Sequence, residues 1–163
     1  MFEAVELGQK LDKKEFKEQE RLIRTRLNEL QRELVVAKIP TLIIVAGVEG
    51  AGKGDVVNRL NKWLDTRGIQ THAFWDETDE ELERPDYWRY WRALAPNGHI
   101  GLFLSSLYSQ PVLRRVYEKD DEVIFDNRLD RIMAFEKALA DDGALIIKFW
   151  MHLSHDAQKR RLK

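Results

Sequence analysis

The sequence predicts an α/β fold built on a parallel β-sheet, and three observations lead to this class. Four short apolar runs alternate with segments whose apolar residues recur at helical spacing. The first run, residues 41–45, has no polar alternation, which is typical of a strand buried on both faces. A glycine-rich loop then joins this run to an amphipathic helix. Strands and helices that alternate in this way favour right-handed βαβ units.

The composition is that of one globular domain and excludes several classes of function. The chain has 163 residues, of which 44% are hydrophobic and 34% charged, and its formal net charge is −1. No bulk charge therefore draws it to nucleic acid or to a membrane. The sequence contains no cysteine, which excludes disulfides, thiolate metal sites and cysteine nucleophiles. It shows neither a signal peptide nor a bilayer-spanning apolar run, so we expect a cytoplasmic protein.

The first helical segment spans residues 9–37 and is highly charged. Its apolar residues recur at helical spacing and form one stripe along it: Phe16, Ile23, Leu27, Leu30 and Leu34. We expect this stripe to pack on the sheet of the same domain, with a subunit or interdomain contact as the alternative. Pro40 ends this segment.

The remaining elements follow in order along the chain. We expect strands at 41–45, 69–75, 100–104 and 144–150, the last one also buried, and helices at 53–67, 85–94 and 110–142 with a break near 119–121. Gly68 is a candidate stop for the helix at 53–67, and residues 76–84 form a solvated acidic stretch. Residues 123–125 fit a helix better than a strand because of their flanks. Ser154 caps a final helix.

Residues 47–54, GVEGAGKG, carry the clearest chemical signal. They match the phosphate-binding loop pattern G-x-x-x-x-G-K-[ST] at all but its last position. The glycines let backbone N–H groups converge on phosphate oxygens, and the helix N-terminus adds its dipole. Lys53 adds a flexible charge that can follow a transferred phosphoryl group. Because a buried strand precedes the motif and an amphipathic helix follows it, we interpret it as a phosphate loop rather than an ordinary turn.

Two residues of this loop depart from common nucleotide-binding proteins. Gly54 stands where kinases and GTPases place a Ser or Thr that holds Mg²⁺. The chain therefore holds the metal in another way or belongs to a different branch. Glu49 places a carboxylate in the loop, where it acts on a metal or acceptor or is simply a solvated residue. The sequence does not separate these two roles.

Three ordered motifs resemble the polyphosphate kinase 2 family, over residues 38–163. The loop resembles that family's G-x-D-x-x-G-K-G, in which a glycine follows the lysine. Residues 88–96, WRYWRALAP, resemble its W-R-Y-W-R-x-L-P segment, and residues 141–154, DDGALIIKFWMHLS, resemble its D-D-G-x-x-x-x-K-F-W-x-H-x-S segment. The resemblance implies a P-loop kinase-like, three-layer α/β/α fold of the thymidylate kinase type with a lid. It also implies phosphoryl transfer from polyphosphate to a nucleoside mono- or diphosphate, with Mg²⁺.

The chain departs from this family after the third strand. The family has F-D-R-S-W-Y there, with an Asp for Mg²⁺ and an Arg for phosphate, whereas residues 103–108 are FLSSLY. Leu104 cannot bind a metal, and Ser105 cannot pair with phosphate as a guanidinium does. Glu49 replaces the loop Asp, and the lid arginines are not recognisable at 109–113. Without these charges phosphoryl transfer loses most of its electrostatic stabilisation, so the sequence does not favour Mg²⁺ in this domain.

The resemblance therefore points to the N-terminal domain of a two-domain polyphosphate:AMP phosphotransferase, as a degenerate half that is structural or binds polyphosphate. It implies a helical extension at 1–37 and a phosphotransferase domain at 38–163 that is truncated at its C-terminal end. The implied partners are polyphosphate, a nucleoside monophosphate and a second homologous domain; a homo-oligomer is compatible, and no nucleic acid or membrane is expected. Two alternatives stay open: an active kinase in which Glu49, Asp76 or Asp126 supplies the carboxylate, and an interaction module with a vestigial loop.

The predicted site residues centre on the loop. Lys53 and Glu49 are the catalytic candidates. The phosphate-binding candidates are Gly47, Val48, Glu49, Gly50, Ala51, Gly52, Lys53, Gly54, Arg89 and Arg92. The two arginines lie near one another on the predicted aromatic helix, where they reach a phosphate chain or form surface salt bridges. His152 and His155 have no third ligand nearby, so no metal site is predicted.

Overall fold

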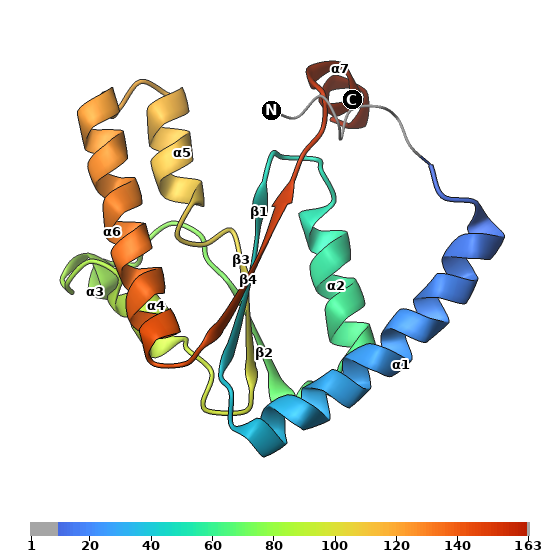
Figure 1. Cartoon of the computed structure of the whole chain (residues 1–163). Helices are drawn as coiled ribbons and strands as arrows, with labels where there is room; N and C mark the ends of the chain where they lie inside the picture. Colours follow the sequence, from blue (N-terminus) through green and yellow to red (C-terminus); the bar gives the residue numbers. More distant parts are fainter. Residues whose placement is uncertain (1–9, 163) are drawn as a thin grey trace.

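The computed structural model describes residues 10–162. Its centre is a four-stranded parallel sheet in the order β2-β3-β1-β4, which confirms the predicted fold class (Figure 1). The strands are β1 (Thr41–Gly47), β2 (Ile69–Ala73), β3 (Ile100–Leu104) and β4 (Leu145–Met151). In register, Val45 lies opposite Leu104 on one side and Phe149 on the other. All four carboxyl ends therefore meet at one edge of the sheet.

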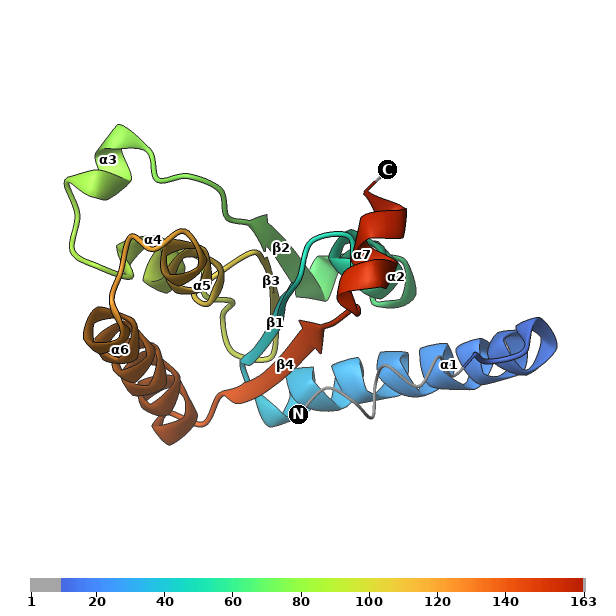
Figure 2. The same cartoon turned by 90° about the horizontal axis from the view of Figure 1, so that it is seen from above.

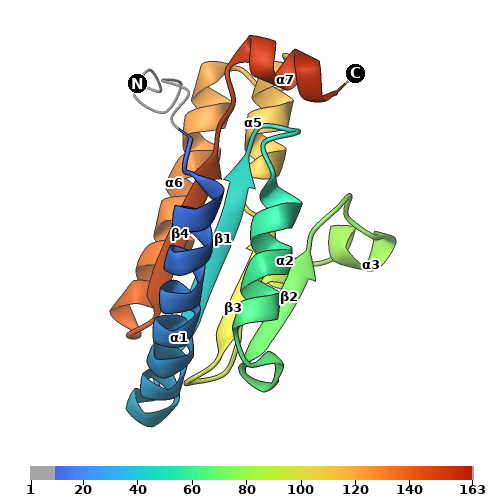
Figure 3. The same ribbon diagram turned by 90° about the vertical axis from the view of Figure 1, so that its right-hand side faces the viewer.

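Helices cover both faces of this sheet. On one face lie α1 (Lys13–Ala37) and α2 (Lys53–Trp63), as Figure 3 shows. On the other lie α4 (Trp88–Arg92), α5 (Ser109–Val116) and α6 (Glu122–Asp141). Seen from above, the sheet separates these two groups (Figure 2). The short helices α3 (Asp79–Leu82) and α7 (His155–Arg161) follow β2 and β4, and α7 lies above the carboxyl edge of the sheet.

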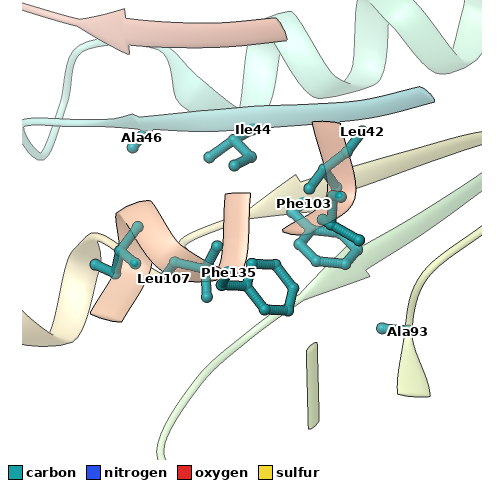
Figure 4. Close-up of a cluster of buried hydrophobic side chains, with 9 residues drawn as sticks. Leu42, Ile44, Ala46, Ala93, Phe103, Leu107 and Phe135 are labelled. Carbon is teal, nitrogen blue, oxygen red and sulfur yellow. The ribbon is translucent and has the colours of Figure 1, made fainter. Parts of the chain in front are cut away.

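Two apolar clusters, one on each face, explain why β1 has no polar alternation. Leu42, Ile44 and Ala46 point into the cluster that contains Phe103 and Phe135 (Figure 4). The alternate residues Ile43 and Val45 point into the second cluster, which includes Val57, Leu64 and Leu102. Because successive side chains of a strand face opposite sides, a strand with a core on both faces must be apolar throughout.

The prediction that the last strand is buried was wrong. β4 is an edge strand of the sheet in the described part of the chain, and it is exposed along much of its length. Leu145, Phe149 and Trp150 keep 43%, 40% and 45% of their surface exposed. A run of apolar residues shows that a strand can be buried on both faces, but it does not say whether a neighbour covers its outer edge.

The helix boundaries differ from the predicted ones at specific residues. α2 ends at Trp63, four residues early, because Leu64 is extended, and Gly68 instead closes the 3₁₀ turn Thr66–Gly68. The acidic stretch contains α3, which a capping box between Thr78 and Glu81 begins. The break near 119–121 and the cap at Ser154 are confirmed.

The apolar stripe of α1 packs on its own domain only in part. Leu27 and Leu34 contact the second cluster, and the buried Gln31 bonds the backbone N–H and carbonyl of Asp65. Phe16, Ile23 and Leu30 stay 37%, 47% and 38% exposed. α1 begins at Lys13, after the cap Asp12, whereas the predicted start at residue 9 lies outside the described residues. Within residues 10–162, no helix is long and apolar enough to cross a membrane.

Candidate functional site

The predicted phosphate loop, residues 47–54, connects the end of β1 to the start of α2 (Figure 1). It lies at the carboxyl edge of the sheet. In open α/β sheets this edge, near the point where strand order reverses, is where ligands bind. β1 is such a point, because the chain places β2 and β3 on one side of it and then β4 on the other. The strand, loop and helix that the sequence predicted are therefore all present.

Three glycines of the loop adopt conformations that other residues reach only with strain. Gly47, Gly50 and Gly52 have φ values of 126°, 77° and 88°. Gly47 also has no room for a side chain, since a Cβ there would lie 2.0 Å from the carbonyl oxygen of Met151. The glycine at position 47 thus serves the close approach of β4 as well as the loop.

The start of α2 provides backbone donors at the site. Its N-cap, Gly52, has no side chain, so no capping group accepts from the first N–H groups of the helix. These donors and the helix dipole favour an anion. Two other N–H groups are already engaged within the fold, those of Val48 with Met151 and of Ala51 with Val48. The arrangement suits a phosphate oxygen at the N-terminus of α2.

Lys53 folds back over the loop. Its Nζ donates to the carbonyls of Gly47 and Val48, each at 3.0 Å. Partial burial lowers the pKa of this ammonium from its ordinary value, and the nearby Glu49 carboxylate acts in the opposite direction. A cation is thereby placed in the centre of the loop, beside the carboxylate that the sequence singled out.

Two carboxylates, those of Glu49 and Asp55, lie in or next to the loop. Glu49 and Asp55 are both exposed, and Asp55 lies in the first turn of α2. Among residues 10–162, no three His, Asp or Glu side chains gather into a group that could hold a metal ion. Mg²⁺ is usually bound through one or two carboxylates together with substrate phosphates. Residues 104–108, at the end of β3 and just after it, contain no carboxylate.

The end of β3, at the same edge of the sheet as the phosphate loop, is apolar. Leu104 pairs in register with Val45 and Ala73 and packs against the second apolar cluster. Ser105 follows with a left-handed φ of 51°. Ser106 is 1% exposed, and its hydroxyl has no partner among the described residues. This segment lies beside the phosphate loop but brings no charged side chain to it.

Arg89 and Arg92 are engaged with their surroundings around α4. Arg89 donates to the carbonyl of Trp75 at 3.1 Å, pairs with Glu81 at 3.3 Å and lies over the ring of Phe74. Its side chain is only 11% exposed. Arg92 lies over the ring of Trp88. No contact joins either arginine to the loop in this conformation, so their role as phosphate ligands stays a prediction.

Sequence reasoning missed two features beside the site. Gln158 and Arg161 of α7 donate to the carbonyls of Glu49 and Gly50, at 3.0 and 2.9 Å. Separations of 109 and 111 residues gave no local signal for these contacts. The second feature, which has no described contact with the loop, is the buried Asp120 near the end of the α5–α6 connection.

Asp120 joins two arginines of the α5–α6 hairpin. Arg114 Nε donates to its two oxygens at 2.9 and 3.0 Å, and Arg128 Nε lies 2.7 Å from it. The hydrogen bonds from Arg114, together with the charges of both arginines, hold the pKa of Asp120 below its ordinary value. Both guanidinium groups are thus held by one protein carboxylate, which balances only one of their two positive charges.

Comparisons with known proteins agree with this geometry. A model of the family described as Polyphosphate kinase 2 matches residues 10–163. A polyphosphate:AMP phosphotransferase of Pseudomonas aeruginosa is 44% identical over the whole chain, which spans about a third (33%) of that protein's length. An AMP/ADP-polyphosphate phosphotransferase of Meiothermus ruber is 28% identical over 87% of the chain and 54% of its own length.

Solved structures of the same family share the fold. A polyphosphate kinase 2 structure from Pseudomonas aeruginosa superposes with a TM-score of 0.94 at 43% identity, covering 100% of this chain and 35% of that one. One from Arthrobacter aurescens has a TM-score of 0.87 at 30% identity and covers 96% of this chain and 57% of its own. The chain therefore belongs to the polyphosphate kinase 2 family.

Proposed function

We propose that this chain is one domain of a polyphosphate-dependent nucleotide phosphotransferase, which converts AMP to ADP, and that it binds polyphosphate without transferring a phosphoryl group itself. The observation that carries the proposal is the contrast between the loop at 47–54 and Leu104 at the end of β3. The loop keeps its glycines and Lys53. The adjacent strand end has lost the charged pair that its family uses.

Binding is supported by the geometry of the loop. The α2 N-terminus offers donors without a capping side chain, and Lys53 lies within the loop. Each of these groups interacts with a phosphate through charge and hydrogen bonds and needs no metal. A polyphosphate chain presents such oxygens repeatedly, so a site for one phosphate can bind many equivalent positions along it.

Catalysis is a different requirement, because it needs groups that stabilise the transition state more than the bound substrate. Leu104 packs into an apolar cluster and Ser105 carries no charge, so neither stabilises the charge of a transferring phosphoryl group. Arg114 and Arg128, which follow on α5 and α6, are paired with Asp120. We derive no step through Mg²⁺, because the residues at this edge do not fit its usual site.

An active kinase is the second candidate, and Glu49 favours it. Its carboxylate lies close enough to Lys53 to oppose the lowering of that ammonium's pKa by burial. Asp76 lies in the connection that follows β2, and Asp126 lies on α6. Of the three carboxylates proposed from the sequence, Glu49 is thus the one with a described interaction inside the loop.

Titration of the chain with inorganic polyphosphate by calorimetry tests the proposal. We expect saturable binding that weakens strongly in Lys53→Ala and little in Lys62→Ala, an exposed lysine of the same helix. Equal affinity of the two variants would contradict a role for the loop and would favour the vestigial-loop alternative.

The proposal extends to the whole protein. Because the chain spans about a third of its Pseudomonas relative (33%), we propose that a second homologous domain carries the chemistry. This domain would then hold polyphosphate or support its neighbour's shape. A nucleotide substrate and the absence of a membrane-spanning helix among residues 10–162 fit a cytoplasmic protein. Self-association is compatible with the exposed apolar residues of α1, and size measurement in solution tests it.

A further inference from the structure

The carbonyl groups of the phosphate loop are held by side chains, one from the loop itself and two from α7. Four consecutive carbonyls, from Gly47 to Gly50, accept side-chain hydrogen bonds. Lys53 donates to the first two at 3.0 Å. Gln158 donates to the third at 3.0 Å and Arg161 to the fourth at 2.9 Å. Because Gln158 and Arg161 are three residues apart on α7, they lie on the same side of that helix.

A hydrogen bond to a carbonyl also orients the next N–H group. In a planar trans peptide, the C=O and the following N–H point in opposite directions. The Glu49 carbonyl points toward α7, so the Gly50 N–H points away from it. The next peptide unit is held at both ends, with its carbonyl bonded to Arg161 and its Ala51 N–H bonded to the carbonyl of Val48 at 3.4 Å. The two α7 side chains thus fix two peptide orientations.

The second half of the loop, residues 50–52, loses the most backbone conformational entropy when it is ordered. Gly50 and Gly52 are left-handed, and glycine gives up more conformational entropy on folding than any other residue. Lys53 reaches the carbonyls before Glu49 but not those after it. Leu162 also lies near Gly50, with its Cδ2 3.6 Å from the position that a Cβ of Gly50 would take. The end of α7 therefore supplies what the loop's own residues do not.

We propose that Gln158 and Arg161 are positioning residues of the phosphate site. By holding the carbonyls of Glu49 and Gly50, they keep the loop in the shape that turns the Gly50 N–H away from α7, toward a phosphate of an inorganic polyphosphate chain at the start of α2. The identity of this ligand rests on the proposed function, whereas the bracing of the loop does not. Both side chains act through the backbone, on the face of the loop that carries its carbonyls.

The test compares substitutions on one face of α7 with a matched control. Arg161→Ala and Gln158→Ala each remove one donor to the loop. Arg160→Ala removes the same charge as Arg161→Ala from an exposed position of the same helix. Two measurements are made on the full chain: hydrogen exchange of peptides that cover residues 47–54, and calorimetric binding of inorganic polyphosphate at low and high salt. Arg161→Lys, which keeps a donor and the charge, tests rescue.

We expect faster exchange in the loop for Arg161→Ala and Gln158→Ala, with the wild-type rate for Arg160→Ala. Polyphosphate affinity should fall about 2- to 10-fold in each bracing variant, the range for one net hydrogen bond. The difference between Arg161→Ala and Arg160→Ala should persist at high salt, because screening removes the general effect of charge but not the loop's shape. Arg161→Lys should recover part of the loss.

Two results would overturn the proposal. Unchanged loop exchange in both bracing variants would show that α7 does not hold the loop. Equal affinity losses in Arg161→Ala and Arg160→Ala, which vanish together at high salt, would show that only charge matters. If the wild-type chain does not bind polyphosphate, the proposed function fails, and the exchange measurement still decides the bracing by itself.

Discussion

Two neighbouring segments at the carboxyl edge of the sheet have been built in opposite ways. The loop after β1 is short and glycine-rich, and its carbonyls are bonded to Lys53, Gln158 and Arg161. The end of β3 carries Leu104 and Ser105, and Arg114 and Arg128, further along the chain, are paired with Asp120. The first segment leaves the uncapped N–H groups at the start of α2 for an external anion, whereas the second brings no charged side chain to it. Under the proposed function, the first segment holds a phosphate and the second does not help to transfer it, so binding and transfer would be separable in this fold.

The largest expected effect comes from Gly47→Ala, which should prevent stable folding of the loop and of β4. Its Cβ would lie 2.0 Å from the Met151 carbonyl oxygen, and its φ of 126° disfavours any side chain. We expect a loss of about 3 kcal/mol or more in the free energy of unfolding, measured by urea denaturation. Gly143→Ala is the matched control, because Gly143 has φ 90° but nothing within 4 Å of its Cβ position. If the two variants were equally stable, the close approach of β4 would not constrain the loop.

Lys53→Ala should have the next largest effect, on binding rather than on stability. Removing a charged donor from the centre of the loop should weaken polyphosphate binding by about 10-fold or more. The melting temperature of the same variant should change little. Partial burial disfavours the charged form of Lys53 and lowers its pKa, so this charge adds little to stability. Lys62→Ala serves as the control on the same helix. A loss of stability without a loss of affinity would place Lys53 among the structural residues.

The strand, loop and helix around residues 47–54 could be predicted from the sequence, because their conformation depends on residues that are close together in the chain. Glycine spacing, the apolar run of β1 and the helical pattern after Lys53 each have a local physical cause. The exposed β4 could not be predicted, since its sequence resembles that of a buried strand and its neighbours are set by topology. The same holds for Gln158 and Arg161, whose partners lie 109 and 111 residues away. Long-range pairing of side chains leaves no periodic signal.

A smaller effect on stability is expected from the titration of Asp120, between α5 and α6, in acid. Because the folded pKa of Asp120 is lowered from 3.8, its contribution to stability is present above that value and is lost as pH falls through the folded pKa. Asp120→Asn should therefore lower the melting temperature at neutral pH and flatten its fall in acid. Asp126→Asn, at an exposed position of α6, is the comparison. Identical acid profiles for wild type and Asp120→Asn would show that the arginines are not held by this carboxylate.

Gly54→Ser should have the smallest effect on the fold. It tests whether a hydroxyl in the loop is enough to make polyphosphate binding depend on Mg²⁺. A Cβ at Gly54 would meet nothing within 4 Å, so packing does not require glycine there. Replacing a helical glycine should add about 0.5 kcal/mol of stability. Because Leu104 is unchanged, we expect the new hydroxyl to bring no Mg²⁺ dependence to polyphosphate binding. Titration with and without Mg²⁺ checks this, and a metal-dependent gain in affinity would show that one residue of the loop is enough to recruit the ion.

The most direct test of the separation between binding and transfer is a single-turnover assay of this chain with polyphosphate, AMP and Mg²⁺. Binding is measured on the same sample by calorimetry. The account predicts that polyphosphate binds in a Lys53-dependent manner while no ADP forms above the level of the Lys53→Ala variant. ADP formation that requires Lys53, at a rate near that of a full-length relative, would contradict it and would assign the catalytic carboxylate to this domain.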